Sequence, residues 1–368
     1  MTPLDELTLL LRPAGGGVFV VSTGRAEQLA MQKALYRATT EDEVIARWRD
    51  ALARVGEARG VILGVPSDVG AGFRRGANLG PQTIRAALLE EVPDFPERAA
   101  RAGLVDLGDV LVVPQLLHDD MLSDAQRTAS RRAMHPDALD AALPVSPLSV
   151  AERALDLVFA ASPGVKPIVL GGDHSTAWPA VAALAKVARA PWGIVQIDAH
   201  TDLLESRLGV RYCFATWSFH ANELIGRSGR LVQVGIRATR HDRGHWESTL
   251  GVRQFWADEC VADPERALDA IVAHVKATGV SAIYFSNDID GTDEAWAEAT
   301  GTPEPNGLSR EFVEELIARL AREVTFLGGD VMEVAPPLGR DPAARARTIA
   351  TAVRYLRATL RATLGVDV

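Results

Sequence analysis

The chain has 368 residues, of which 47% are apolar and 24% are charged, and its formal net charge of -9 disfavours broad binding to nucleic acid, whose phosphates need a basic surface. Two cysteines, Cys213 and Cys260, exclude a disulfide framework. Because no run of about 20 apolar residues occurs and the N-terminus is acidic, unlike a signal peptide, we expect a cytoplasmic protein with no membrane or nucleic-acid partner.

The first part of the chain predicts a helical segment followed by a buried strand. Residues 25–58 carry apolar side chains at roughly helical spacing. The apolar run over 61–65 then predicts a strand that is buried on both faces of a parallel sheet. A glycine-rich loop over 67–80 leads to Pro81, which stands where helices begin, so we expect a helix over 81–89.

Strand and helix patterns alternate through the rest of the chain. We expect strands at 103–107, 167–170, 193–197, 231–234, 282–285 and 323–327, and helices at 150–160, 177–188, 264–277, 309–322 and 342–364. This alternation predicts an α/β fold with three layers, α/β/α, around a mostly parallel central sheet. The polar segment 114–148 predicts a surface insertion, and a linker between two domains is the alternative interpretation.

Polar residues directly follow four of the predicted strands, where parallel sheets usually form a site crevice. Asp198, His200 and Asp202 alternate along the chain, so in extended backbone their side chains share one direction. The same reasoning applies to Asp288 and Asp290. Such a group would be strongly repulsive and costly to bury without partners, and divalent cations resolve that conflict.

The residue types indicate which cations fit. Mixed imidazole and carboxylate ligands suit manganese, iron, nickel or zinc better than calcium, which prefers oxygen alone. One histidine with carboxylates per ion fits two metals, and such a pair makes hydroxide available from a bridging water at neutral pH. A single Asp-x-His or Asp-x-Asp is more often a cap or turn, and Gly171-Gly172 lacks the lysine of a phosphate-binding loop. The joint occurrence after separate strands favours the metal interpretation.

These motifs together resemble the ureohydrolase family, which includes arginase, agmatinase, guanidinobutyrase and formimidoylglutamase. The resemblance covers roughly residues 60 to 365 and implies an arginase-like fold. We therefore expect an N-terminal helical extension over 1–58 and a metal-dependent catalytic domain over 59–368. The motifs that carry it are Gly64-Val-Pro66, Gly80-Pro-Gln-Thr-Ile-Arg85, Asp106-Leu-Gly-Asp109, Gly171-Gly-Asp-His-Ser175, Asp198-Ala-His-Thr-Asp202, Val234-Gly-Ile-Arg237, Ser286-Asn-Asp-Ile-Asp290, Ala299-Thr-Gly-Thr-Pro303 and Asp330-Val-Met-Glu333.

The resemblance also implies a reaction and roles for individual residues. The reaction is hydrolysis of a C–N bond in a linear guanidino or amidino substrate, with urea as product, or formamide for a formimino substrate. Glu333 would accept hydrogen bonds from the amidinium, Asp293 would lie near the substrate, and Asp202 would also count as catalytic. A homo-oligomer, trimer or hexamer, is implied as well. The implied ligands of two Mn²⁺ per subunit are His174, Asp198, His200, Asp202, Asp288 and Asp290.

One departure from the family pattern concerns proton transfer. The family places a proton-shuttling histidine about ten residues after the second metal motif, where this chain has Cys213 or Phe214. His220, six residues beyond Phe214, is our candidate replacement. A metal-binding relative that has lost catalysis and acts as a regulatory or scaffolding subunit is the alternative that this departure motivates.

A second departure concerns the choice of substrate. Residues 203–208 replace the small polar residues that hold the amino-acid end of arginine in arginases, which disfavours arginase activity. Arg207 or Arg211 could pair with a substrate carboxylate, whereas Glu205 could face a cationic tail such as that of agmatine. We expect an agmatinase- or guanidino-acid-type enzyme, with Arg207 as a substrate-binding residue and formimidoylglutamase as the second choice.

Overall fold

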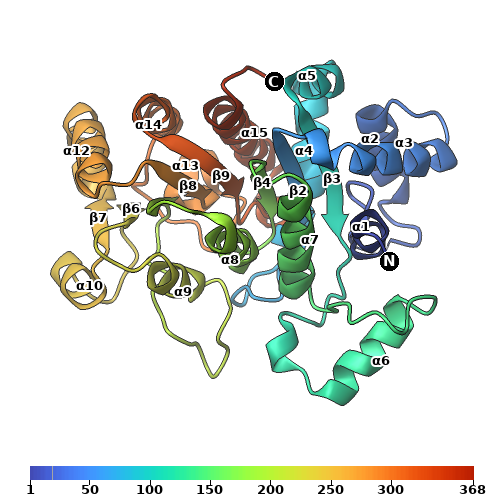
Figure 1. Cartoon of the computed structure of the whole chain (residues 1–368). Helices are drawn as coiled ribbons and strands as arrows, with labels where there is room; N and C mark the ends of the chain where they lie inside the picture. The colour runs from blue at the N-terminus through green and yellow to red at the C-terminus, as the bar shows by residue number, and fades with distance from the viewer. Residues whose placement is uncertain (19) are drawn as a thin grey trace.

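The computed structural model describes every residue except Phe19, and its centre is one sheet (Figure 1). The order of strands in this nine-stranded sheet is β1-β3-β2-β4-β9-β8-β5-β6-β7. β1 runs antiparallel to β3, and the other neighbouring pairs are parallel. The strands are β1 (Leu11–Arg12), β2 (Gly60–Val65), β3 (Leu104–Val110), β4 (Lys166–Gly171), β5 (Trp192–Ile197), β6 (Leu231–Ile236), β7 (Arg253–Trp256), β8 (Ala282–Asn287) and β9 (Thr325–Val331).

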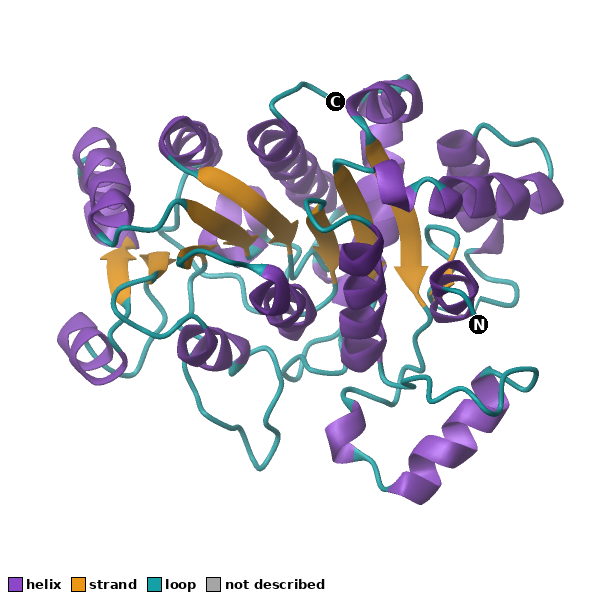
Figure 2. Cartoon of the chain, viewed as in Figure 1, coloured by secondary structure: helices purple, strands orange, loops and turns teal. Residues whose placement is uncertain are grey.

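Helices cover both faces of the sheet, so the predicted three-layer α/β/α fold is confirmed (Figure 2). One layer contains α4 (Gly80–Glu91), α12 (Pro264–Ala277), α14 (Arg310–Glu323) and α15 (Pro342–Leu364), and the other contains α1 (Pro3–Leu10), α7 (Pro147–Ala161), α8 (Trp178–Val187) and α9 (Trp217–Leu224). The remaining helices are α2 (Arg25–Tyr36), α3 (Glu41–Ala53), α5 (Phe95–Ala102), α6 (Asp124–Met134), α10 (Arg243–Leu250), α11 (Ala257–Ala262) and α13 (Glu294–Ala297).

The strands occur where continuous apolar runs predict them, because both faces of this sheet are covered by helices. Every residue of β2, β5 and β6 is buried. β7 was not predicted because its four residues include Arg253 and Gln254, which give no apolar run. The prediction for β9 began two residues early, since α14 continues to Glu323 and the strand begins at Thr325.

The predicted helical segment 25–58 is two helices rather than one. Arg37 has a left-handed backbone with φ of 53°, which ends α2. Thr40 then accepts a hydrogen bond from the backbone N–H of Glu43 and begins α3. A Thr cap followed by acidic residues is a usual start of a helix, so the break at 37–40 has a local cause that spacing of apolar residues does not reveal.

The N-terminal residues close one edge of the sheet. Leu11 pairs with Val110 in the antiparallel contact between β1 and β3. The Oδ2 atom of Asp109 accepts a hydrogen bond of 2.7 Å from the backbone N–H of Gly15. The Trp48 indole of α3 donates to the backbone oxygen of Leu107 at 2.9 Å. These contacts satisfy polar groups of β3 that an open sheet edge would leave unpaired.

The segment 114–148 lies outside the sheet, as predicted for an insertion. It contains α6, which has no buried residue. The strands before and after it, β3 and β4, both pair with β2 in the same sheet. The segment is therefore not a linker between two separate domains. Among the helices that the structure describes, none combines the length and the apolar character needed to cross a membrane.

Candidate metal centre

The motifs converge at the carboxyl ends of four neighbouring strands. In the sheet these strands stand in the order β4-β9-β8-β5. Residues 171–175 follow β4, residues 198–202 follow β5, residues 288–293 follow β8 and residues 330–333 end β9. Because the strands are parallel and adjacent, segments distant in the sequence meet in one crevice.

The backbone of these segments is not extended, which corrects the reasoning from alternation. Asp202 has φ of 52°, in the left-handed region that non-glycine residues rarely adopt. Asp288 caps the short 3-10 helix Ile289–Gly291 and accepts a hydrogen bond of 2.9 Å from the backbone N–H of Asp290. Side chains of each motif therefore meet through tight turns, whose geometry the alternation of residue types does not reveal.

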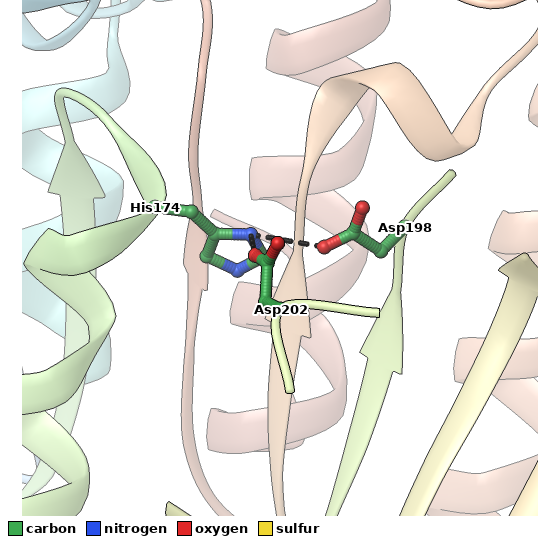
Figure 3. A group of neighbouring side chains, drawn as sticks. All are labelled: His174, Asp198 and Asp202. Atoms are coloured by element: carbon green, nitrogen blue, oxygen red, sulfur yellow. Dashed lines mark ion pairs between the residues drawn. The ribbon is translucent and has the colours of Figure 1, made fainter. Parts of the chain in front are cut away.

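The first cluster surrounds the buried imidazole of His174. Its Nδ1 atom lies 3.1 Å from Oδ2 of Asp198 and 3.4 Å from Oδ2 of Asp202. Figure 3 shows these three side chains pointing toward one another. Oδ2 of Asp288 lies 3.0 Å from the same nitrogen. His174, Asp198 and Asp202 each offer one atom close enough to the others to hold a single cation.

The second cluster shares Asp198 with the first. Nδ1 of His200 lies 3.6 Å from Oδ1 of Asp198 and 3.1 Å from Oδ2 of Asp290. These three residues likewise can hold one cation. Since Asp198 takes part in both clusters through different oxygens, the arrangement offers two adjacent candidate cation sites that would share a carboxylate.

The hydrogen bonds of His174 test whether the first cluster fits a metal. Its Nε2 atom lies 3.0 Å from Oγ of Ser286, which in turn contacts the Asp330 carboxylate at 3.0 Å. Its Nδ1 atom is buried and makes no hydrogen bond of good geometry. If the Nε2 atom carries the proton and donates a hydrogen bond to Ser286, the lone pair of Nδ1 faces three carboxylates. A buried nitrogen that makes no hydrogen bond but faces three carboxylates fits a metal ligand whose other ring nitrogen is held by Ser286.

The electrostatics of the clusters reflect crowded carboxylates. Burial and then the Asp198 carboxylate raise the pKa of Asp202 to about 7. Burial, followed by the carboxylates of Asp290 and Asp198, raises the pKa of Asp288 well above its usual range. Burial opposes the charge of His200, yet nearby carboxylates raise its pKa to about 12. The protein thus retains protons in this crevice, and a bound cation would take their place.

Glu333 stands beside these clusters in a constrained backbone. Its φ is 61°, again in the left-handed region. Oε1 accepts a hydrogen bond of 3.0 Å from the backbone N–H of His174. Oε2 lies 3.6 Å from the place that a Cβ would take at Gly301. Burial and then the Asp173 carboxylate raise the pKa of Glu333 well above its usual range, so the site favours a cationic ligand that would restore its charge.

Known proteins resemble this chain in both sequence and fold. The family model described as "Arginase family" matches residues 58–360. The chain belongs to the arginase family. Guanidinobutyrase of Pseudomonas aeruginosa is 30% identical over 286 residues, which are 75% of this chain and 78% of that protein. The mitochondrial guanidino acid hydrolase of Homo sapiens is 32% identical over 283 residues, covering 75% of this chain and 71% of that protein.

A solved arginase-family structure shows the same architecture. Proclavaminate amidino hydrolase from Streptomyces clavuligerus superimposes with a TM-score of 0.61 and 27% identity, covering 82% of this chain and 92% of that one. The predicted family and the arginase-like fold are therefore confirmed. As a member of the arginase family, the chain is a hydrolase of C–N bonds in linear guanidino compounds.

The place of the arginase-family shuttle histidine is occupied differently here. Cys213 is buried, and Phe214 is half-buried with its backbone N–H bonded to the oxygen of Gly70 at 3.1 Å. His220 lies in α9, where its Nε2 atom is 3.1 Å from each of the backbone oxygens of Glu205 and Arg211. A proton carried by His220 would have to use Nδ1, because Nε2 binds the 203–214 loop.

Three further residues that the sequence proposes for the substrate site lie outside the metal clusters. The carboxylate of Asp293 accepts hydrogen bonds from the backbone N–H groups of Ala295 at 3.0 Å and Gly307 at 2.9 Å, so it braces two loops. Arg207 is exposed, and its guanidinium carbon lies 4.8 Å from the centre of the Phe214 ring. Arg211 lies instead over Tyr212, at 5.0 Å.

Several residues that support the ligands were not assigned a role from the sequence. The Trp217 ring lies 4.5 Å from the His174 ring, and its indole donates to Oδ2 of Asp202 at 3.1 Å. Gln196 donates to Oδ2 of Asp198 at 2.6 Å, and Thr302 donates to Oδ2 of Asp290 at 3.0 Å. Gln196 had one available signal, since it is a polar residue inside an otherwise apolar strand.

Proposed function

We propose that the chain is a two-metal hydrolase that releases urea from a guanidino acid or from agmatine. The observation that carries this proposal is the pair of ligand clusters that share Asp198, with the buried carboxylate of Glu333 beside them. Relatives named guanidinobutyrase and guanidino acid hydrolase support the substrate class.

The proposed cofactor is two Mn²⁺ per subunit, with nickel, iron and zinc as alternatives. His174, Asp198, Asp202 and Asp288 would hold one ion, and His200, Asp290 and Asp198 would hold the other. This assignment is supported by the mixed nitrogen and oxygen donors and by Nδ1 of His174, which makes no hydrogen bond and faces three carboxylates. When bound, the ions would lower the pKa of water and supply hydroxide at neutral pH.

The side chains of this chain would bind and orient the substrate. Glu333 is the proposed acceptor for the amidinium, because ionising this buried carboxylate next to a cationic ligand removes the cost of its charge. Hydrolysis adds one water across the C–N bond and yields urea and an amine, which must gain a proton. His220 is the proposed shuttle, which would take up the water's proton on Nδ1 and pass it to the amine, and Asp202 is proposed to act as a catalytic carboxylate as well as a ligand. Asp293 would act by bracing the surrounding loops.

The remaining proposals concern organisation. We place an N-terminal helical extension at 1–58 and the catalytic domain at 59–368. The pairing of β1 with β3 and the family match over residues 58–360 support a distinct role for the N-terminal part, namely covering the sheet edge. We further propose a cytoplasmic homo-oligomer, trimer or hexamer, that binds neither nucleic acid nor membrane.

The test is product release by protein loaded with manganese or nickel. Arginine, agmatine, guanidinobutyrate and guanidinopropionate are assayed for urea, and formimidoylglutamate is assayed for formamide. We expect urea from a guanidino acid or agmatine, and its loss in the isosteric variant Glu333→Gln with metal content unchanged. Formamide alone would favour the formimidoylglutamase type. If protein that holds two metals per chain gives no product, the enzyme proposal is contradicted and a metal-binding relative that has lost catalysis is favoured.

A further inference from the structure

A groove of about 550 Å³ lies beside the strand-end crevice and has no role in the reaction described above. Three segments line it, residues 69–73, 115–122 and 207–214. Its volume falls in the range that accepts a small-molecule ligand rather than a short alkyl chain alone. The larger apolar side chains that line it include Val69, Phe73, Leu116, Met121, Leu208 and Phe214.

The first wall of the groove touches the segment that carries His174. A Cβ at Gly70 would lie 2.4 Å from Oγ of Ser175 and 2.7 Å from Oδ1 of Asp173. The same loop continues to Arg74, whose backbone oxygen lies 3.8 Å from the Cβ position of Gly301, the residue that also faces Glu333. The loop thus runs from the groove to the proposed amidinium site.

The second wall is the 203–214 loop, both ends of which lie beside the Asp202 carboxylate. The 203–214 loop begins directly after Asp202 and leads back to Trp217, which donates to the Asp202 carboxylate at 3.1 Å. The backbone N–H of Phe214 donates to the oxygen of Gly70 at 3.1 Å and joins the two walls. The groove walls are therefore continuous along the chain with the segments that carry Asp202 and Trp217.

The charge of the groove indicates which charge the substrate carries at the end away from its guanidino group. Arg207 is the single charged residue that lines it, and no carboxylate lines it among the residues that the structure describes. Arg207 has no ion pair with an acid in the described part of the chain, and its guanidinium lies over the Phe214 ring. Glu205, the alternative partner for a cationic tail, does not line the groove.

The exposure of the loop tips indicates an apolar ligand. Phe73 is 90% exposed and Leu208 is 98% exposed, although both line the groove. Large apolar side chains gathered at a concave surface commonly mark a binding site, because a ligand removes them from water. Arg207 beside them supplies a charged donor for one polar group of that ligand.

From this arrangement we infer that the substrate is a guanidino or amidino acid with a bulky apolar spacer, bound with its carboxylate at Arg207. The inference rests on the proposed function and specifies the substrate class of the same site. An aryl or branched spacer fills the groove between the loops, while the amidinium faces Glu333. A short diamine derivative such as agmatine places its ammonium beside Arg207, a like charge, and leaves the groove open.

The test uses two substrates that differ only in the charge of the tail, the para-guanidinomethyl derivatives of benzoate and of benzylamine. We expect kcat/KM for the benzoate to exceed that for the benzylamine by about tenfold or more, since a charge-assisted contact at a partly exposed arginine distinguishes them. Arg207→Gln should remove that preference. The matched variant Arg211→Gln, which removes the arginine outside the groove, should keep it within about twofold.

A second variant tests the apolar wall. Leu208→Ser changes a fully exposed tip, so the fold is retained, and it should raise KM for the benzoate but not for guanidinopropionate, which is too short to reach it. Urea released faster from agmatine or the benzylamine than from the benzoate would overturn the inference while the proposed function stands. A lower oligomer mass of Leu208→Ser without a change in selectivity would also overturn it, since the groove would then be a contact with a second copy.

Failure of the proposed function gives a different result. If no guanidino compound yields urea, calorimetry with the carboxylate ligand 4-ethylbenzoate still measures the affinity of the groove in the wild type and in Arg207→Gln. Weaker binding by the variant supports the anionic tail site, and equal or absent binding overturns it.

Discussion

The two halves of the candidate metal centre differ in how firmly their histidines are held. The His174 side chain is 1% exposed, and Ser286 with Asp330 fixes its Nε2 atom. The His200 side chain is 26% exposed, and its Nε2 atom lies 3.7 Å from Oε1 of Glu304, whose side chain is itself 36% exposed. An imidazole oriented by a buried partner loses less freedom on binding a metal than one that faces solvent. The comparison therefore predicts a tight inner site and a weaker, more exchangeable outer site.

The largest effect is expected from Asp198, the carboxylate common to both halves. Asp198→Asn should lose both metals, and its Tm should lie roughly 5–10 °C below that of the metal-loaded wild type, because bound ions stabilise by mass action. Elemental analysis and calorimetry measure these changes. Asp269→Asn, on the exposed face of α12, serves as the control and should keep both metals. Retention of two metals by Asp198→Asn would refute the shared-ligand assignment.

The comparison itself is tested by changing one histidine at a time. His174→Asn should abolish the tighter of two binding steps in a metal titration, because it removes the buried ligand. His200→Asn should abolish the weaker step and leave about one metal per chain. Equal affinities of the single remaining sites would show that burial and the Ser286 contact do not distinguish the halves.

The residues that contact the Nε2 atoms of the two histidines should have smaller effects on metal affinity, and these effects should differ between the two sites. Ser286→Ala removes the contact to Nε2 of His174 and should weaken the tighter site by about 10- to 100-fold. Glu304→Gln changes only a distant, exposed partner of His200, so we expect a change of less than about threefold. Metal competition with a chelating dye reports both. A larger effect from Glu304 would reverse the proposed order.

A further effect concerns the pH dependence of metal affinity. In the metal-free protein the pKa of Asp202 is raised to about 7, so this carboxylate holds a proton below that pH although an unfolded chain would not. The folded metal-free chain therefore loses stability as pH rises from about 4 to 7, because Asp202 ionises in the unfolded chain while the folded chain keeps its proton. Metal affinity must rise over the same interval, up to about tenfold per pH unit for each proton released. Calorimetry in two buffers of different ionisation enthalpy counts the protons, and zero release would contradict the shift.

The sequence predicts the strands and the convergence of motifs better than the support around them. Strands such as β2 and β5 are apolar throughout, and each acidic motif follows a strand directly, so parallel topology alone brings the motifs together. The left-handed backbone at Asp202 and Glu333 and the contact of Trp217 with Asp202 depend on tertiary packing. They leave no local pattern, and the same is true of the contact between His220 and the 203–214 loop.

The position of β9 has a consequence for how the chain folds. This last strand of the sequence lies between β4 and β8 in the middle of the sheet. Until residues 325–331 are made, the sheet consists of two separate halves, and His174 belongs to one half while Asp198, His200 and Asp288 belong to the other. Pairings so distant in sequence form slowly. The His174 site should therefore form late on the ribosome, and a chain truncated before β9 should lack that site although each of its ligands is present, whereas Asp198, His200 and Asp290 stay together in the other half.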